Sequence, residues 1–333
     1  MKILFLTASF KTPSARFRVL QNLDIWRGLG LEVEAVPLPK SNWKRLKLLQ
    51  QLPSYDIVLL QKRLLHRHSL YLLRQRARIL VYDFDDAVMF SDSNSEDFIS
   101  PRKSQRFAAI ARSADLFCAG NDYLKEQALN AGARRVEIVP TGVDCDYFRP
   151  GPLSPDSSDS RPLNIGWIGS RANLVYLQAL AEPLNRLFEL RRDFKLTIVC
   201  DDFIDDFHCP VEKIRWSAKR EVDDIRGFDI GVMPLVEDPW TKGKCAFKLL
   251  QYMACGLPAV ASATAVTEKI VKSGVNGMLA SNPPAMVEKI SWLLDHRQDL
   301  PAIGVMARQS ILGIYDSRTV ARRYASLFAQ LSS

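Results

Sequence analysis

Lysines gather where a polar loop meets a predicted helix in the second half of the chain. Residues 242–244 form the loop, Lys-Gly-Lys, and good helix formers follow over residues 246–254. The N-terminus of such a helix presents unpaired N–H groups and a partial positive charge. With Lys244 and Lys248 beside it, and with the amide of Gln251 one turn further on, the stretch is suited to hold a phosphate and hydroxyl groups. A surface helix with solvated lysines would give the same pattern, so the segment alone leaves both interpretations open.

A second candidate anion site follows the predicted strand 163–168. Gly169, Ser170 and Arg171 come directly after this strand and before a predicted helix over residues 173–190. Small residues allow the backbone to approach a ligand closely, and the helix start and the arginine add positive charge.

Two arginines open a predicted helix near the start of the chain. Arg16 and Arg18 follow the predicted strand 2–7 and begin a helix that we expect over residues 16–29. Guanidinium groups pair well with planar anions, so this pair would suit a diphosphate or the carboxylate of an acceptor.

Three carboxylates follow the predicted strand 79–82. Asp83, Asp85 and Asp86 stand in the sequence Asp-Phe-Asp-Asp. Carboxylates so placed can coordinate a hard cation, act as a base, or accept hydrogen bonds from sugar hydroxyls. The spacing by itself does not choose among these three.

Strands alternate with helices along the whole chain, which predicts parallel sheets with ligands beyond the carboxyl ends of the strands. No G-x-G-x-x-G motif occurs, which argues against a dinucleotide-binding dehydrogenase. The expected strands are 2–7, 33–36, 57–60, 79–82, 116–119 and 136–139, then 163–168, 196–200, 214–216, 228–235 and 259–261.

Composition is that of a globular protein of about two domains, with 333 residues of which 47% are hydrophobic and 25% charged. The net charge of +8 lies mostly in the first half, where residues 1–150 carry +7. Residues 40–78 hold ten basic side chains and one acid, Asp56. Such a run suits anionic lipid headgroups, nucleic acid or a phosphorylated substrate, and a solvated helix face is an equal alternative.

Cysteine usage and hydropathy bear on the compartment. The six cysteines show no C-x-x-C spacing, and Met1-Lys2 runs directly into a strand-like segment rather than a signal peptide. No apolar stretch approaches the roughly 20 residues that cross a bilayer. We therefore expect a cytoplasmic protein with free thiols, whose membrane contact is peripheral.

Several motifs together resemble the family 4 (group 1) retaining glycosyltransferases of GT-B fold. Residues 243–258 read Gly-Lys-Cys-Ala-Phe-Lys-Leu-Leu-Gln-Tyr-Met-Ala-Cys-Gly-Leu-Pro, similar to the donor-site helix of one branch of that family. Residues 140–148 resemble its Pro-x-Gly-Val-Asp-x-x-x-Phe segment. The resemblance spans nearly the whole chain and is strongest at 228–262, 163–171 and 136–150.

The resemblance implies an α/β fold with two Rossmann-like domains facing each other across a cleft. Residues 1–150 would be the acceptor-binding domain, 151–162 a linker, and 163–316 the nucleotide-sugar-binding domain. The last helix, 317–333, would cross back to the first domain with an apolar stripe of Val320, Tyr324, Leu327 and Phe328.

The same resemblance implies roles for the candidate residues. Arg171, Lys244 and Lys248 would stabilise charge on the leaving diphosphate, and Asp85 or Asp86 would orient the acceptor hydroxyl. Relatives carry glutamates at the positions of Gly243 and Gln251, so the sugar-facing carboxylate is missing here. The implied donor-binding residues are Gly169, Ser170, Arg171, Lys244, Lys248 and Gln251, the implied catalytic ones Asp85, Asp86 and Lys248, and the acceptor residues Arg16 and Arg18.

The implied function is transfer of a sugar from a nucleotide-diphospho-sugar to a glycan, lipid-linked or other cell-envelope acceptor, with retention of configuration. The donor is a substrate, and no cofactor or metal is expected. One alternative is a GT-B-like protein that binds a nucleotide-sugar or a partner without transfer. Another is a metal-dependent transferase of the GT-A fold that uses Asp83 and Asp85. Nucleic-acid binding is not expected, since no recognition motif appears.

Overall fold

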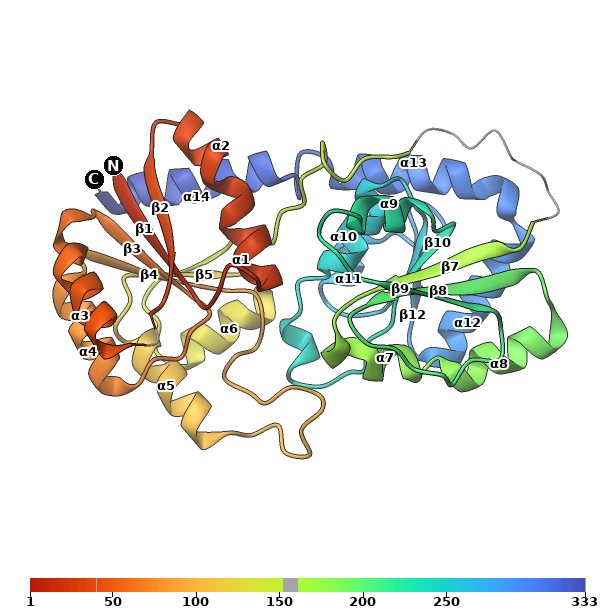
Figure 1. Cartoon of the computed structure of the whole chain (residues 1–333), viewed down its shortest axis with the longest axis horizontal. Helices are drawn as coiled ribbons and strands as arrows, with labels where there is room; N and C mark the ends of the chain where they lie inside the picture. Colours follow the sequence, from red (N-terminus) through yellow and green to blue (C-terminus); the bar gives the residue numbers. More distant parts are fainter. Residues whose placement is uncertain (40, 152–160, 333) are drawn as a thin grey trace. The chain divides into compact units, whose positions relative to one another are not determined.

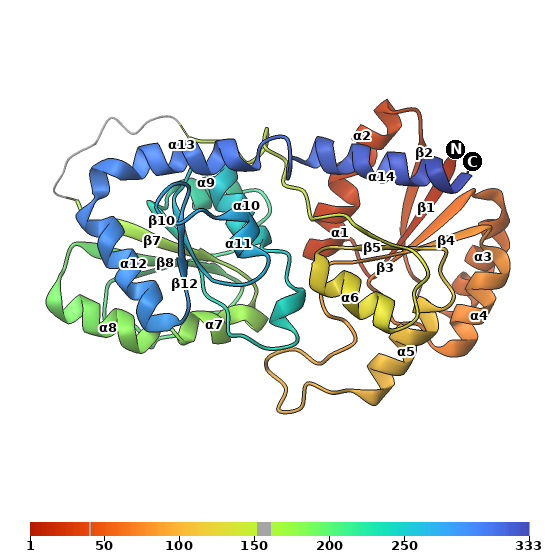
Figure 2. The ribbon, with the colours of Figure 1, turned by 180° about the vertical axis from the view of Figure 1, so that it is seen from behind.

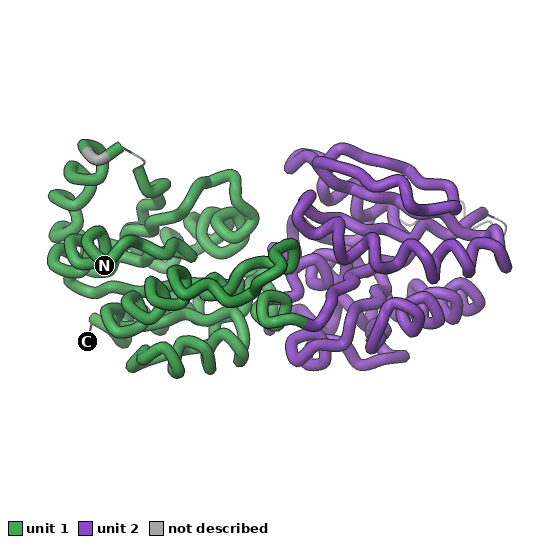
Figure 3. Tube along the Cα trace, turned by 90° about the horizontal axis from the view of Figure 1, so that it is seen from below, with its two compact units in different colours: residues 1–142, 238–245, 315–333 green, residues 143–237, 246–314 purple. Residues whose placement is uncertain are grey.

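The computed structural model of the protein describes residues 1–39, 41–151 and 161–332. Contacts divide the chain into two compact units, which Figure 3 shows in different colours. Unit 1 consists of Met1–Gly142, Asp238–Cys245 and Tyr315–Ser333, and unit 2 of Val143–Glu237 and Ala246–Ile314. Most of the predicted linker, residues 152–160, lies outside the described residues, as does Lys40 of the basic run.

Unit 1 is built on a parallel six-stranded sheet in the order β2-β1-β3-β4-β5-β6. All six strands were predicted, because each is a short apolar run bounded by polar residues. They are β1 (Lys2–Thr7), β2 (Glu32–Pro37), β3 (Ile57–Gln61), β4 (Ile79–Phe84), β5 (Leu116–Ala119) and β6 (Val136–Ile138).

Helices cover both faces of this sheet (Figure 1). One apolar core lies between the sheet and α3 to α6, and a second lies between the sheet and the pair α2 and α14. The helices of unit 1 are α1 (Pro13–Arg18), α2 (Leu23–Gly28), α3 (Asn42–Gln51), α4 (Arg67–Arg76), α5 (Pro101–Ala111), α6 (Asp122–Asn130) and α14 (Ser317–Ser332), with short 3-10 turns η1 (Leu20–Asn22), η2 (Leu52–Ser54) and η4 (Thr241–Gly243).

The single helix predicted over residues 16–29 is wrong in detail, because the chain breaks between α1 and α2. Val19 leaves the helical region, with φ −120° and ψ −65°. Side-chain amides bind the carbonyls at the end of α1, since Asn22 donates to the carbonyl of Arg18 at 3.1 Å and Gln21 donates to that of Phe17. Such side-chain bonds compete with the regular helix ladder.

The last helix, α14, belongs to unit 1, although the first segment of this unit ends at Gly142. Its predicted stripe of Val320, Tyr324, Leu327 and Phe328 is buried in the core that contains α2. Figures 1 and 2 show the two termini side by side, and the hydroxyl of Ser332 reaches the sulfur of Met1 at 3.1 Å.

Unit 2 repeats the architecture, with a parallel sheet in the order β12-β11-β10-β7-β8-β9. The strands are β7 (Leu163–Ile168), β8 (Phe194–Cys200), β9 (Val211–Arg215), β10 (Ile230–Met233), β11 (Ala259–Ser262) and β12 (Met278–Ala280). Its helices are α7 (Leu174–Gln178), α8 (Ala181–Leu190), α9 (Glu221–Arg226), α10 (Phe247–Ala254), α11 (Thr267–Ile270), α12 (Pro283–Asp295) and α13 (Leu300–Ile311), with 3-10 turns η3 (Arg171–Asn173) and η5 (Arg297–Asp299).

The helix predicted over residues 173–190 is two helices, α7 and α8, with a turn at residues 179–180. Both pack on β7 and β8 in one apolar core with α12. Strand β12 was not predicted, because a three-residue edge strand carries too little pattern to recognise.

Two further expectations bear on compartment and membrane. The structure describes all six cysteines, and none of them forms a disulfide. Among the residues that the structure describes, no helix combines the length and the apolar character needed to span a bilayer.

Candidate functional site

The strand order of unit 2 places a topological switch point between β7 and β10. From β7 the chain runs to β8 and β9 on one side of the sheet, then returns to β10 on the other side. In open parallel sheets, ligands bind beyond the carboxyl ends of the strands at such a point. The predicted residues Gly169, Ser170 and Arg171 follow β7 directly and therefore lie there.

Lys248, in the first turn of α10, converges on this turn. A Cβ added to Gly169 would lie 3.1 Å from Cε of Lys248 and 2.4 Å from the ring of Trp167. The ammonium of Lys248 lies over that ring, 5.8 Å from its centre. Gly169 therefore leaves room for the lysine beside the backbone, and the structure brings these two predicted residues together.

Two other residues of α10 lie deeper. Gln251 is buried, with 5% of its surface exposed. Its neighbour Tyr252 ties the helix to the sheet, since the hydroxyl accepts from the amide of Ile168 at 3.1 Å and donates to the carbonyl of Val232 at 3.3 Å. These two bonds fix α10 across the ends of β7 and β10.

Ser170 and Arg171 are exposed. The amide of Arg171 donates to the carboxylate of Asp201 at 2.8 Å, and its guanidinium lies 3.2 Å from Asp202. The hydroxyl of Ser170 accepts from the amide of Asn173 at 2.9 Å. The acidic pair after β8 thus orders the turn after β7, a link that the sequence pattern did not reveal.

The remaining predicted donor residue, Lys244, falls in unit 1 with the segment Asp238–Cys245. Its ammonium lies over the ring of Trp240, 5.7 Å from the centre, and this ring packs against the core of unit 1. The amide of Asn121 donates to the carbonyls of Lys242 and Lys244, each at 3.2 Å. Asp238 accepts from the hydroxyl of Ser93 at 2.6 Å.

Close packing within unit 1 explains the glycine at position 243. A Cβ there would lie 2.5 Å from the backbone nitrogen of Ala87, closer than real side chains approach a backbone. The next residue but one, Cys245, points its thiol at the carbonyl of Asp85 at 3.4 Å. A glutamate at position 243 is therefore incompatible with this packing.

Unit 1 has its own switch point, between β1 and β3. Lys62, directly after β3, reaches the hydroxyl of Ser14 at 3.1 Å and forms a hydrogen bond with the carboxylate of Asp86. Its ammonium also lies 3.6 Å from Oδ1 of Asp85. Lys62 has the left-handed backbone conformation, with φ 57°, which costs a non-glycine residue free energy and is uncommon.

Electrostatics in this cluster favour ionised groups. Burial by itself raises the pKa of Asp85, but the charges of Lys62 and Arg18 lower it further than burial raises it. Burial likewise lowers the pKa of Lys62, and the carboxylates of Asp85 and Asp86 bring its net pKa above the usual range. Within the described residues, Oδ1 of Asp85 is buried without a hydrogen-bond partner.

Lys62 was not predicted as a site residue, because in the sequence it is one of the ten basic residues of the run 40–78. Its position directly after a buried strand was the available signal. The predicted pair Asp85 and Asp86 does lie at the carboxyl end of β4, next to this lysine.

The role predicted for Arg18 does not fit the structure. Its guanidinium is buried and donates to Asp83 at 2.9 and 2.7 Å, to Thr141 at 3.0 Å and to the carbonyl of Val139 at 3.0 Å. The hydroxyl of Tyr324 lies 2.6 Å away. Arg18 therefore holds β4, the segment after β6 and α14 together. Its guanidinium donates hydrogen bonds inside the fold and does not face an acceptor substrate.

Arg16 differs from Arg18 in that it is only partly buried. It lies in α1 near the switch point of unit 1, with its guanidinium 4.7 Å from the centre of the Phe17 ring. It stays a candidate contact for an acceptor.

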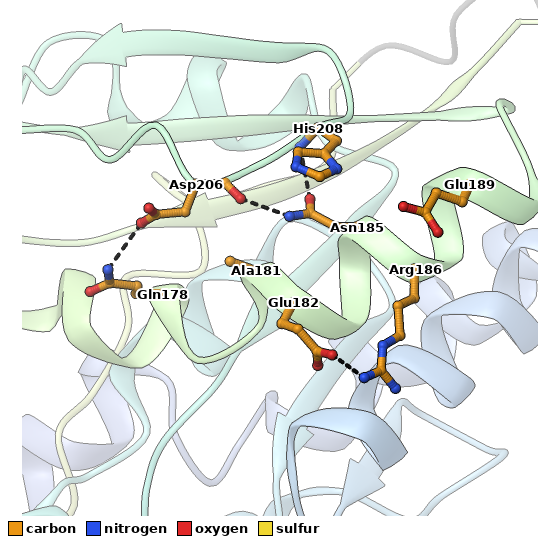
Figure 4. Close-up of a pocket in the computed structure, with 8 residues that line it drawn as sticks. All are labelled: Gln178, Ala181, Glu182, Asn185, Arg186, Glu189, Asp206 and His208. Carbon is orange, nitrogen blue, oxygen red and sulfur yellow. Dashed lines mark hydrogen bonds and ion pairs between the residues drawn. The ribbon is translucent and has the colours of Figure 1, made fainter.

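Figure 4 shows a hollow of unit 2 that contains none of the predicted site residues. It is open, and lies between α8 and the loop that joins β8 to β9. The side chain of Asn185 bridges this loop, accepting from the amide of His208 at 2.7 Å and donating to the carbonyl of Asp206 at 2.8 Å. The lining residues are Gln178, Ala181, Glu182, Asn185, Arg186, Glu189, Asp206 and His208.

Comparison with known sequences gives the family of the segment that contains the turn 169–171 and helix α10. Residues 163–296, which contain β7 to α12, match the family Glycosyl transferases group 1. This segment is a group 1 glycosyltransferase domain. The same segment holds the turn after β7 and helix α10, so the predicted resemblance to group 1 glycosyltransferases is confirmed for this segment.

One curated relative of this chain is TuaH of Bacillus subtilis, which is named as a putative teichuronic acid biosynthesis glycosyltransferase. It is 23% identical over 197 residues, which make up 55% of this chain and 48% of TuaH. The chain therefore spans about half the length of the curated relative that it matches.

Solved structures with the same fold cover nearly the whole chain. Anabaena Alr3699/HepE, crystallised in complex with UDP-glucose, has a TM-score of 0.72 at 17% identity, over 99% of this chain and 100% of that one. Sucrose-phosphate synthase from Thermosynechococcus elongatus has a TM-score of 0.77 at 14% identity, over 99% of both chains. At these identities the likeness shows the fold, which is GT-B. The alternative of a GT-A transferase is therefore wrong, and Asp83, its proposed metal ligand, is paired with Arg18.

Proposed function

We propose that this protein is a retaining glycosyltransferase. It transfers a sugar from a nucleotide-diphospho-sugar to a glycan, lipid-linked or other cell-envelope acceptor. The observation that carries the proposal is the convergence of Lys248 on the turn at Gly169, inside the segment that matches the group 1 family. This is a cationic group beside an open backbone turn, at the switch point of a parallel sheet.

In this proposal unit 2 binds the donor. Backbone N–H groups of the turn 169–171, the N-terminus of α10 and the ammonium of Lys248 face the diphosphate, with Arg171 adding charge. These groups stabilise the negative charge that develops on the diphosphate as the bond to the anomeric carbon breaks, which is electrostatic preorganisation. Gln251 holds hydroxyl groups of the ribose through its amide.

Unit 1 binds the acceptor in the same proposal. Asp85 or Asp86 orients the acceptor hydroxyl, and the charge of Lys62 helps to hold the pKa of Asp85 below its usual range. Arg16 lies near enough to this switch point to contact a charged acceptor. The name of TuaH and the basic first half of the chain favour an acceptor of the cell envelope, and the protein would act in the cytoplasm.

Donor binding is the first test, because it needs no knowledge of the acceptor. The measurement is the thermal shift given by UDP, GDP, ADP, CMP and their common sugar conjugates, with and without EDTA. HepE was crystallised with UDP-glucose, so UDP-sugars come first in the panel. A ligand at a hundredfold excess over its dissociation constant stabilises by roughly 2.7 kcal/mol.

Matched lysine variants make this test specific. Lys248→Ala should lose the shift, whereas Lys289→Ala, which removes an exposed lysine of α12, should keep it. EDTA should leave the shift unchanged, since the proposed reaction uses no metal. Transfer is then measured as release of the nucleotide on addition of candidate acceptors.

Two results would argue against the proposal. A donor that binds through Lys248 but shows neither transfer nor hydrolysis would favour a nucleotide-sugar-binding protein. If no nucleotide of the panel raises the unfolding temperature of the wild type, the proposed donor site does not bind a donor.

A further inference from the structure

Exposed aromatic side chains and basic charge coincide on two neighbouring helices of unit 1. Trp43 on α3 is 76% exposed and Tyr71 on α4 is 62% exposed, more than any other aromatic side chain of the described residues. Leu46, one turn after Trp43, is 50% exposed. Isolated exposed apolar residues are common, but these three lie on two helices that contact each other, in the most basic part of the chain.

All charged side chains on helices α3 and α4 are basic. Lys44 and Lys47 on α3 and Arg67 on α4 are exposed, and neither helix contains an acidic residue. We call Trp43, Lys44, Leu46, Lys47, Arg67 and Tyr71 the α3–α4 patch. Helices α3 and α4 contact each other, and Figure 1 shows them side by side on one flank of the sheet.

We propose that the α3–α4 patch docks on the surface of a bilayer rich in anionic lipid. Tryptophan and tyrosine favour the interface between headgroups and acyl chains, and lysines beside them meet the lipid phosphates. Leu46 favours a membrane over nucleic acid as the partner. An exposed aliphatic side chain is stabilised by contact with acyl chains, but it neither stacks on bases nor binds phosphate.

The position of the patch gives this docking a consequence for the enzyme. In a parallel α/β sheet each helix that follows a strand begins at the carboxyl edge of the sheet, so the first turns of α3 and α4 lie near that edge. Lys62 and the carboxylates Asp85 and Asp86 lie at the same edge of unit 1. A membrane-docked patch would place this cluster near the lipid surface, which favours a lipid-linked acceptor over a soluble glycan.

Docking goes beyond the proposed function, and its test needs neither donor nor acceptor. The purified full-length chain is sedimented with vesicles of phosphatidylcholine alone, or of phosphatidylcholine and phosphatidylglycerol in equal parts. The wild type should sediment with the anionic vesicles only, and the bound fraction should fall as salt is added. Failure to bind the anionic vesicles at low salt would overturn the proposal.

Two double variants distinguish vesicle binding through the α3–α4 patch from attraction by the basic charge of the whole protein. Lys44→Glu with Lys47→Glu should weaken vesicle binding by about tenfold or more, since each basic residue at an anionic surface contributes about 1 kcal/mol. Lys272→Glu with Lys289→Glu makes the same charge change in unit 2 and should leave most of the binding. An equal loss in both pairs would mean non-specific attraction and would refute docking through the patch.

The apolar part is tested in the same assay. Trp43→Ser with Leu46→Ser should weaken binding by about tenfold, because two apolar side chains that docking would bury in the bilayer surface are lost. Leu190→Ser, at a leucine of α8 that is 86% exposed, should have no effect. If the Trp43 and Leu46 variant binds vesicles normally but loses binding to a fluorescent single-stranded oligonucleotide, the partner is nucleic acid and the membrane proposal fails.

Discussion

The guanidinium of Arg18 and the carboxylate of Asp83 form a bidentate ion pair in the interior of unit 1. The two N–O distances are 2.9 and 2.7 Å, and each side chain is 1% exposed. The hydroxyl of Tyr324, from the last helix, donates to the same carboxylate at 2.5 Å. Three segments far apart in sequence thus meet at one buried charge pair.

Removal of one partner should be far more damaging than removal of both. Arg18→Met or Asp83→Leu leaves a buried charge without its partner and should lower the free energy of unfolding by about 3 to 5 kcal/mol. The double variant should recover much of this loss. Thermal unfolding of the three variants measures it, and strictly additive losses would show that the two side chains do not act as a pair.

Lys62→Met should destabilise the protein in a pH-dependent way. The folded pKa of Lys62 is raised, so its contribution is present below its ordinary pKa and is lost only in strong alkali. The folded pKa of Asp85 is lowered, so its contribution is present above its ordinary pKa, about 4, and is lost in acid. The stability difference between wild type and Lys62→Met should therefore be largest near neutral pH.

Urea unfolding at neutral and at acid pH measures this difference. Lys289→Met, at an exposed lysine of α12, should show little difference from wild type at either pH. A loss of stability in Lys62→Met that stays constant from neutral pH into acid would contradict the ionic role of Lys62.

Gly243→Ala should destabilise the segment Asp238–Cys245, because the new Cβ would meet the backbone nitrogen of Ala87 at 2.5 Å. A backbone atom cannot move aside cheaply, so we expect a loss of about 1 to 3 kcal/mol. Gly28→Ala is the matched control, since the Cβ of residue 28 would meet no atom within 4 Å and alanine favours helix α2. In thermal unfolding, the midpoint temperature should fall for Gly243→Ala and rise for Gly28→Ala. Equal midpoints in the two variants would refute the packing argument.

Ala246→Gly should stabilise the protein or leave it unchanged. Ala246, just before α10, has φ 52° and ψ 30°, a left-handed conformation that costs an alanine about 1 to 2 kcal/mol. Glycine adopts it freely, at some cost through the entropy of the unfolded chain. Ala302→Gly, in the ordinary helix α13, should instead lose about 1 kcal/mol. A similar loss in both variants would show that position 246 is not strained.

The sequence by itself determined the fold class, every strand except β12, and the position of the turn 169–171 after β7. Strands such as β1, β5 and β7 were predicted to the residue, because a buried strand is a local apolar run and needs no knowledge of its partners. The turn 169–171 and helix α10 followed from the rule that ligands sit beyond the carboxyl ends of parallel strands.

Only the tertiary structure decided what individual charged side chains do. Arg18 and Arg16 look alike in sequence, yet one is paired with a carboxylate 65 residues away and the other is partly exposed. Lys62 lay unnoticed in a basic run until the sheet brought it to Ser14, Asp85 and Asp86. A glutamate at position 243, which the family resemblance leads one to expect, would collide with the backbone of Ala87, 156 residues away in sequence. Local periodicity fixes which residues form an element, but the energy of a charge or a close contact depends on partners that only folding brings near.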